Sequence, residues 1–332
     1  MSNQEDYFLQ SVIVTRKDEE PIELDLSFLD EVTFVETLDL SGPRLMMSFR
    51  DPYRIIRDDN KVRPRDILEV RFSDVWGRDE INCTIPFTIW NMPIVGDIVS
   101  VNCMQANIDL LKTPAKDSLL FPQKPVSAIL NKLLPGLKYD TGNFAAIEDY
   151  HLMPGERPSK LVRQMAREKG AVCFYKRGTV VFRTASELLK KESKLIYEHA
   201  NISAKNQIAD YMKPNDSAII KDKLERNFIG WDMEKGIVQS TAKTNKPPEY
   251  VSLSNQKTMA NMLSIPLPAI DFTTLGNGEL KPGIPVGLKW NVNRIDAPID
   301  ESLPSKVLIG TVAHYYRSQK YLCRVKGVIP YA

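Results

Sequence analysis

The segment VRPRDILEVRF, residues 62–72, recurs in altered form as LKPGIPVGLKW, residues 280–290. The two segments match at the aliphatic, basic, proline, aliphatic, aliphatic, basic and aromatic positions. In each copy, a proline-bearing turn precedes a stretch in which apolar and polar residues alternate, which is the pattern of a half-buried strand. A β unit that occurs twice, at two distant places in one chain, predicts two related barrels around an insertion.

A second pair of segments follows in the same order. Residues 87–101 and residues 310–325 each contain an alternating strand, a polar or glycine-bearing break, and another alternating strand. The distance along the chain between the two members of a pair differs by about five residues from the first pair to the second. A longer loop accommodates this difference, because loop-closure entropy grows slowly with length. The alternative is chance, since proline before a strand is common, but two echoes in one order favour a duplication.

Composition sets the general class of the protein. The 332 residues are 43% hydrophobic and 26% charged, which is the balance of a globular protein long enough for two cores. The net charge of +2 gives no global electrostatic reason to bind nucleic acid or an anionic membrane. No apolar run approaches the ~20 residues that span a bilayer, so we expect no membrane segment.

The N-terminus and the cysteines indicate where the chain is made. The acidic segment 1–12 has neither the basic region nor the apolar region of a signal peptide. Cys83, Cys103, Cys173 and Cys323 are scattered singly, without the spacing of a zinc site or a disulfide framework, and are expected to be small buried apolar residues. We therefore expect synthesis in a reducing cytoplasm.

The hydrophobic pattern divides the chain into three parts. Residues 1–110 contain a run of short strands with turn residues between them, including 76–79, and are expected to form a first β-barrel domain. Residues 111–214 read as an inserted α+β region, with helices near 126–134 and 158–169 and a hairpin over 171–183. Residues 215–332 return to β character as a second barrel domain. The expected fold is mainly β, with two related antiparallel barrels flanking a helix-plus-hairpin region.

Two blocks resemble a known family. Residues 154–183, PGERPSKLVRQMAREKGAVCFYKRGTVVFR, are similar to the helix-then-hairpin block of contractile-tail baseplate hub proteins, a group that includes phage tail hubs, late-control D proteins and the hub half of type VI secretion spikes. In that family a helix with a leucine and then a basic residue ends in Glu-x-Gly before an aromatic-bearing hairpin. The corresponding residues here are Leu161, Arg167, Glu168, Gly170, Phe174 and Tyr175. Residues 307–330 look like the family's last β unit, with Val312 and His314 at the positions of its Val-x-His.

The resemblance implies a structural role in the baseplate of a virion tail. Three copies of a two-barrel chain would present six similar barrels in a ring, so that a homotrimer could join a sixfold tail tube to a threefold spike and enclose the ejection channel. The implied partners are a central spike protein, tail tube or tube-initiator proteins, baseplate wedge proteins, the tape-measure protein as a further candidate, and passing DNA bound without sequence specificity. Because the chain ends soon after the second barrel, the spike is expected to be a separate polypeptide. A lumen that lets phosphates pass is expected to be acidic or neutral.

The sequence predicts no catalytic, cofactor-binding or metal-binding residues, and therefore no enzyme. His151, His199 and His314 are separated by dozens of residues, and no paired-cysteine, nucleophile-elbow or phosphate-loop motif occurs. Two alternatives stay open. A tail-associated peptidoglycan or polysaccharide hydrolase needs two carboxylates that are close in space but not in sequence. A carbohydrate-binding module would need its aromatic residues, such as the tryptophans at 76, 90, 231 and 290, to form one exposed stripe.

Overall fold

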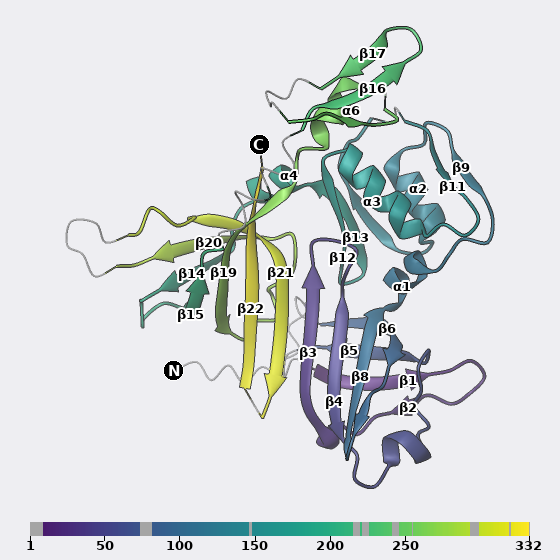
Figure 1. The fold of residues 1–332 in the computed structure, drawn as a ribbon. Helices are drawn as coiled ribbons and strands as arrows, with labels where there is room; N and C mark the ends of the chain where they lie inside the picture. Colours follow the sequence, from purple (N-terminus) through teal and green to yellow (C-terminus); the bar gives the residue numbers. More distant parts are fainter. Residues whose placement is uncertain are drawn as a thin grey trace.

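The fold is mainly β, with two six-stranded units and a few short helices (Figure 1). A computed structural model describes residues 9–73, 82–145, 148–214, 220, 226–240, 246–253, 255–292, 299–318 and 320–331. The expected turn at 76–79, with its tryptophan, lies outside the described residues. Within the described part of the chain, no helix has both the length and the apolar character needed to cross a membrane.

The first barrel is built from an antiparallel sheet in which strand neighbours follow the order β1-β5-β6-β8-β4-β3. Apolar residues alternate with polar ones along these strands, so one face is buried and the other is exposed. The strands are β1 (Leu9–Thr15), β2 (Ile22–Glu23), β3 (Leu29–Thr37), β4 (Arg44–Arg50), β5 (Ile67–Phe72), β6 (Cys83–Asn91), β7 (Ile94–Val95) and β8 (Ile98–Gln105). A 3-10 turn, η1 (Leu26–Phe28), and a π-helical turn, η2 (Ile55–Asp59), connect them.

The second barrel repeats this neighbour order and closes on itself. Its strands follow the order β14-β20-β21-β22-β19-β15, and β15 pairs back to β14. The strands are β14 (Leu195–His199), β15 (Gln207–Met212), β19 (Pro266–Leu275), β20 (Pro285–Trp290), β21 (Lys306–Arg317) and β22 (Lys320–Pro330). Taken in chain order, each strand occupies the same place as its counterpart β1, β3, β4, β5, β6 or β8 in the first barrel. The second barrel is antiparallel except at β14, which runs parallel to both of its neighbours.

The duplication extends to single hydrogen bonds. Arg65 has a φ of 78° and donates its amide N–H to the carbonyl oxygen of Ile89 at 2.9 Å. In the second copy, Gly283 has a φ of 75° and donates its amide N–H to the carbonyl oxygen of Ile309, also at 2.9 Å. These positions coincide in the alignment of residues 62–72 with 280–290. The alignment of 87–101 with 310–325 has the wrong register, because it sets Ile89 opposite Val312, whereas the hydrogen bonds set it opposite Ile309.

Strand pairing also departs from the expected division of the chain at residue 214. The sequence analysis assigned β14 and β15 to the inserted region, but their hydrogen bonds make them part of the second barrel. Both strands are short. Strand β14 is mostly half-buried and β15 is largely exposed, so neither shows the alternation that marks the other barrel strands.

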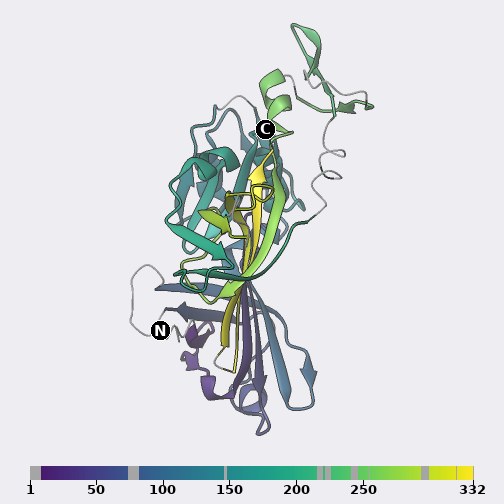
Figure 2. The same ribbon diagram turned by 90° about the vertical axis from the view of Figure 1, so that its left-hand side faces the viewer.

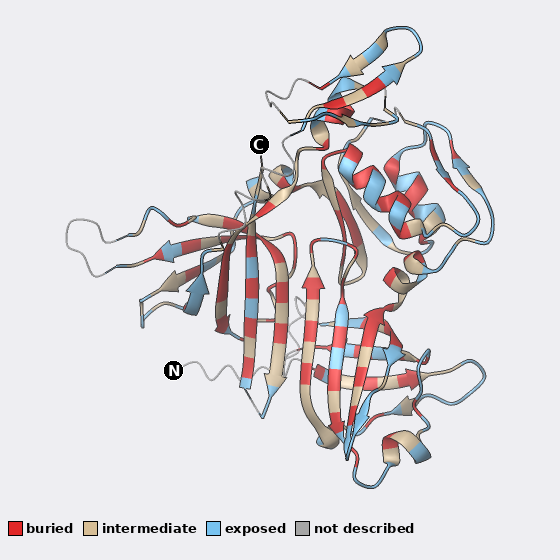
Figure 3. Ribbon diagram, viewed as in Figure 1, coloured by how far each residue is buried: buried red, intermediate tan, exposed pale blue. Residues whose placement is uncertain are grey.

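The inserted region packs short helices against small sheets. Its elements are α1 (Ala106–Lys112), β9 (Leu119–Phe121), α2 (Val126–Leu133), β10 (Lys138–Thr141), β11 (Tyr150–Leu152), α3 (Pro158–Glu168), β12 (Ala171–Lys176), β13 (Thr179–Thr184) and α4 (Ala185–Lys190). Helix α3 begins at Pro158, whose missing N–H costs nothing in a first turn. Gly170, with a φ of 59°, follows its end. The buried face of α3 carries Leu161, Val162 and Met165. Figure 3 shows how buried and exposed residues alternate along the helices of this region.

A small fourth unit projects at the end of the molecule away from the first barrel (Figures 1 and 2). It consists of β16 (Phe228–Asp232), β17 (Gly236–Gln239), β18 (Glu249–Tyr250) and α6 (Gln256–Asn261). Phe228, Met259 and Met262 form a core of its own.

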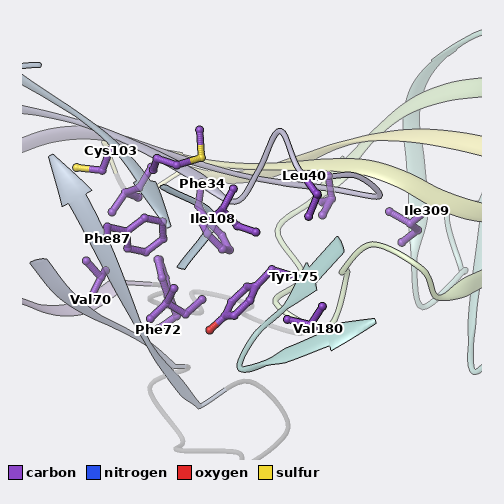
Figure 4. Packing of buried hydrophobic residues seen from close by; sticks show 14 of the residues in the cluster. Phe34, Leu40, Val70, Phe72, Phe87, Cys103, Ile108, Tyr175, Val180 and Ile309 are labelled. Atoms are coloured by element: carbon purple, nitrogen blue, oxygen red, sulfur yellow. The ribbon is translucent and has the colours of Figure 1, made fainter. Parts of the chain in front are cut away.

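The barrels and the hairpin share one continuous core instead of two. Phe34 and Phe72 of the first barrel stack at a centroid distance of 4.6 Å. Tyr175 of the hairpin and Ile309 of the second barrel belong to the same packed cluster (Figure 4). The two barrels and the hairpin are therefore expected to hold fixed positions relative to one another.

Candidate functional site at the junction of the two barrels

The two barrels join edge to edge through β3 and β21. The first part of β21 pairs with β20 inside the second barrel, and its remainder, from Thr311 to Arg317, pairs antiparallel with β3 of the first barrel. Figure 1 shows these strands side by side. Because the β3 edge is covered by the second barrel, one sheet runs through both.

A buried ion pair lies at this seam. Glu36 of β3 is completely buried and accepts hydrogen bonds from Arg177, at 2.7 Å from Nη2 and 3.2 Å from Nε. Arg177 sits in the β12–β13 turn with a φ of 41°. Its guanidinium also donates to the carbonyl oxygens of Gly278, at 2.6 Å, and Leu280, at 3.1 Å. One side chain of the inserted hairpin thus holds both the first barrel and the loop before β20.

His314 of β21 continues the cluster. Its Nε2 lies 3.1 Å from the carbonyl oxygen of Leu280 and its Nδ1 lies 2.8 Å from the hydroxyl of Tyr321. Because a carbonyl oxygen only accepts, Nε2 carries a proton. Cys323 of β22 lies beside the ring, with Sγ 3.3 Å from Nδ1. The polar atoms of the imidazole are therefore satisfied at both ends.

The electrostatics of the seam favour a charged pair. Burial by itself would raise the pKa of Glu36, but the Arg177 guanidinium, together with the His314 imidazole 3.6 Å away, outweighs it and holds that pKa below its usual value. Burial likewise acts to lower the pKa of Arg177, and Glu36 raises it. Two opposite charges that face each other in a dry site cancel most of each other's field, which is the condition for keeping both ionised.

Among the residues that carry the family resemblance, Gly170 and Phe174 lie at joints between units, whereas Glu168 makes its contact within the inserted region. Glu168 at the end of α3 accepts from the hydroxyl of Tyr150 at 2.7 Å. A Cβ on Gly170 would lie 3.1 Å from the carbonyl oxygen of Asn261, so the turn after α3 approaches the fourth unit closely. Phe174 of β12 packs on Gly283, where a Cβ would lie 2.4 Å from its ring.

The remaining resemblance residues differ in burial. Leu161, Tyr175, Val312 and His314 are buried, whereas Arg167 is exposed and contacts Glu249 of the fourth unit at 3.3 Å. The structure brings His314 into the seam cluster but leaves the other two histidines elsewhere. His151 lies on β11, and His199 lies at the end of β14 with its ring 4.9 Å from that of Tyr211.

The sequence reasoning missed Glu36, Arg177, Tyr321 and the role of Cys323. The available signal was weak: an arginine in a tight turn, and a glutamate at the position that continues the alternation of Val32 and Phe34. Cys323 is buried as expected, but it contacts a histidine and is not surrounded only by apolar groups.

The chemistry of the cluster is structural. A cysteine beside a histidine has the composition of a nucleophile and its base, but these side chains are 0% and 1% exposed, so a substrate has no access to them. Among the described residues, no group of three or more His, Cys, Asp or Glu side chains is placed to hold a metal ion. What the arrangement does is fasten three units of the chain together.

The fold is similar to those of tail proteins. A 43 kDa tail protein of prophage MuSo2 from Shewanella oneidensis is 11% identical, with a TM-score of 0.59 over 96% of this chain and 98% of that chain. A tail protein from Neisseria meningitidis is 12% identical, with a TM-score of 0.60 over 96% of this chain and 95% of that one. An Escherichia coli component of the type VI secretion system, which is itself similar to the T4 bacteriophage tail proteins gp27 and gp5, is 13% identical, with a TM-score of 0.55 over 97% of this chain and 77% of that chain.

No family model matches the sequence, and no curated protein matches it. The likeness therefore rests on the arrangement of the backbone over almost the whole chain. The chain has the fold of phage tail proteins.

Proposed function

We propose that this protein is the structural hub of a contractile phage tail or a related injection device. Three copies would form a pseudo-sixfold ring that joins the sixfold tail tube to the threefold spike and encloses the ejection channel. The observation that carries the proposal is the internal duplication, in which six strands of each barrel follow one neighbour order. A trimer of such a chain offers six similar positions around an axis. A chain with one barrel would need six copies to offer the same number.

The junction supplies the rigidity that this role requires. Six positions are equivalent only if the two barrels of each chain keep a fixed relation. The β3–β21 pairing, the continuous core and the buried Glu36–Arg177 pair all oppose movement of one barrel against the other. The tail proteins and the secretion component with the same fold support a place in a tail or baseplate.

The proposed partners follow from the position of a hub. They are a second and third copy of the chain, a central spike protein, tail tube or tube-initiator proteins, baseplate wedge proteins, the tape-measure protein as a further candidate, and DNA in passage. The proposed location is the baseplate of the virion tail, after synthesis in the host cytoplasm.

The other candidate functions gain no support from the tryptophans. Trp290 is buried and donates to the carbonyl oxygen of Pro304 at 2.8 Å. Trp90 lies on β6 of the large sheet, whereas Trp231 lies on β16 of a separate three-stranded sheet. The three described tryptophans therefore form no single stripe for a carbohydrate chain. For the hydrolase, the hub proposal predicts no clearing of a peptidoglycan gel at any protein concentration.

Electron cryo-microscopy tests the proposal directly. Particles of the protein mixed with the central spike protein of the same tail are expected to give threefold class averages with six similar lobes around a channel. Averages that show single two-lobed chains, with and without the spike protein, would contradict it.

A further inference from the structure

A cavity of about 500 Å³ lies between the hairpin, the segment after α4 and the loop before β20. Four of its lining residues are lysines brought together from three parts of the chain: Lys176, Lys191, Lys194 and Lys281. Among the described residues that line it, the only acidic ones are Glu192 and Glu279. We call this cavity the lysine pocket.

The duplication explains how the pocket arises. Its loop belongs to the second copy of the repeated segment, and Gly283 in that loop lies against Phe174 of the hairpin. In the first copy, the position of Ile284 is held by Asp66, a buried carboxylate 2.8 Å from Arg16. The second copy has an apolar side chain at that position, so the lysine pocket carries no carboxylate there.

The cations of the lysine pocket oppose one another. Burial lowers the pKa of Lys176, and Lys281 and Lys191 lower it further, to about 8. An anion placed among these ammonium groups would relieve the repulsion, because opposite charges at short range favour the charged form. Concave sites with one dominant charge sign also concentrate ions of the opposite sign.

We propose that the lysine pocket binds a carboxylate-rich peptide segment of a partner protein, in which acidic side chains alternate with apolar ones. Leu195, Ile284 and Pro285 also line the cavity and offer apolar surface to such a segment. Its volume lies in the range of sites for small ligands and short segments, and is far too small for a nucleic-acid duplex. The inference concerns a single chain and does not depend on the trimeric ring.

One feature favours a peptide over a single-stranded nucleic acid. The described lining residues include no aromatic side chain, so the cavity lacks the stacking platform that single-stranded nucleic acids use.

Fluorescence anisotropy with short labelled probes tests the proposal on the full chain. The probes are a blocked peptide of alternating glutamate and leucine, the same peptide with glutamine in place of glutamate, and a short oligothymidylate. The pocket variant is K191Q/K194Q and the matched control is K132Q/K257Q, because all four lysines are exposed and only the first two line the cavity. The affinity of the glutamate peptide is expected to be the same for the control variant and the unaltered protein. Its affinity for the pocket variant is expected to be about tenfold lower.

A second readout does not depend on variants. Acetylation of lysines, mapped by mass spectrometry on the unaltered protein, is expected to be suppressed at Lys176 and Lys281 when the glutamate peptide is present, and unchanged at Lys132. Equal binding of the glutamine peptide, or equal affinity of pocket and control variants for the glutamate peptide, would overturn the proposal. Tighter binding of oligothymidylate that K191Q/K194Q abolishes would overturn it in favour of a nucleic-acid site.

Discussion

At the scale of single residues, the seam depends on one charged pair. Glu36 and Arg177 are separated widely in sequence but lie 2.7 Å apart with almost no exposure, and Arg177 has two further acceptors. Removing one member of a buried pair leaves the other charge without compensation, which costs far more than the loss of an exposed pair. The pair therefore determines how firmly the hairpin holds the barrels.

Substituting Glu36→Gln tests this point. The uncompensated Arg177 cation is expected to reduce the free energy of unfolding by about 3–5 kcal/mol, measured by chemical denaturation. Asp30→Asn is the matched control, because Asp30 pairs with the half-exposed Arg317 at 3.4 Å on the same two strands. The control is expected to lose less than about 1 kcal/mol. Equal losses in the two variants would contradict the account of the seam.

The pH dependence of stability has a sign that follows from the same pair. The pKa of Glu36 lies below its ordinary value near 4.5 in the folded chain, so the folded state holds this proton less tightly than the unfolded state. Its contribution is therefore fully present above about pH 4.5 and is lost as the pH falls through the folded pKa.

Denaturation midpoints measured from neutral to acidic pH are expected to fall less steeply for E36Q than for the unaltered protein, because glutamine does not titrate. Parallel curves for the two proteins would show that Glu36 does not contribute to the acid sensitivity.

At the scale of elements, the duplication provides an internal control. Gly283 and Arg65 occupy the same turn position with φ values of 75° and 78°, and Gly283 lies against the ring of Phe174. Gly283→Ala places a methyl group about 2.4 Å from Phe174 and strains the left-handed backbone, so it is expected to destabilise the protein by about 2 kcal/mol or more. Arg65→Ala keeps the strain that arginine already has and loses an exposed ion pair with Asp109.

The measurement is the thermal midpoint of both variants. A large drop for G283A with little change for R65A is expected. Similar shifts would show that Phe174 does not fasten the hairpin to the second barrel.

The sequence was informative where local pattern decides structure. The alternation in β5 and β20 is present in the burial of both strands, and α3 begins at Pro158 as its pattern predicted. The short, mostly half-buried β14 has no such pattern, and its pairing with β15 and β20 is what makes it a barrel strand. The site is harder still to predict from the sequence, because Glu36 and Arg177 meet through long-range packing that no local pattern encodes.

At the scale of the whole molecule, the fold joins two copies of one barrel by a shared sheet edge and one continuous core. In the proposed hub, this arrangement would give a threefold assembly six similar positions. The central claim is that the chain works as a trimer around the tail axis.

Light scattering on the purified protein measures this most directly, over a concentration series and with the central spike protein of the same tail added. We predict a particle of three 37.7 kDa chains, alone or once the spike protein is present. A particle mass of one chain at every concentration, unchanged when the spike protein is added, would contradict the account.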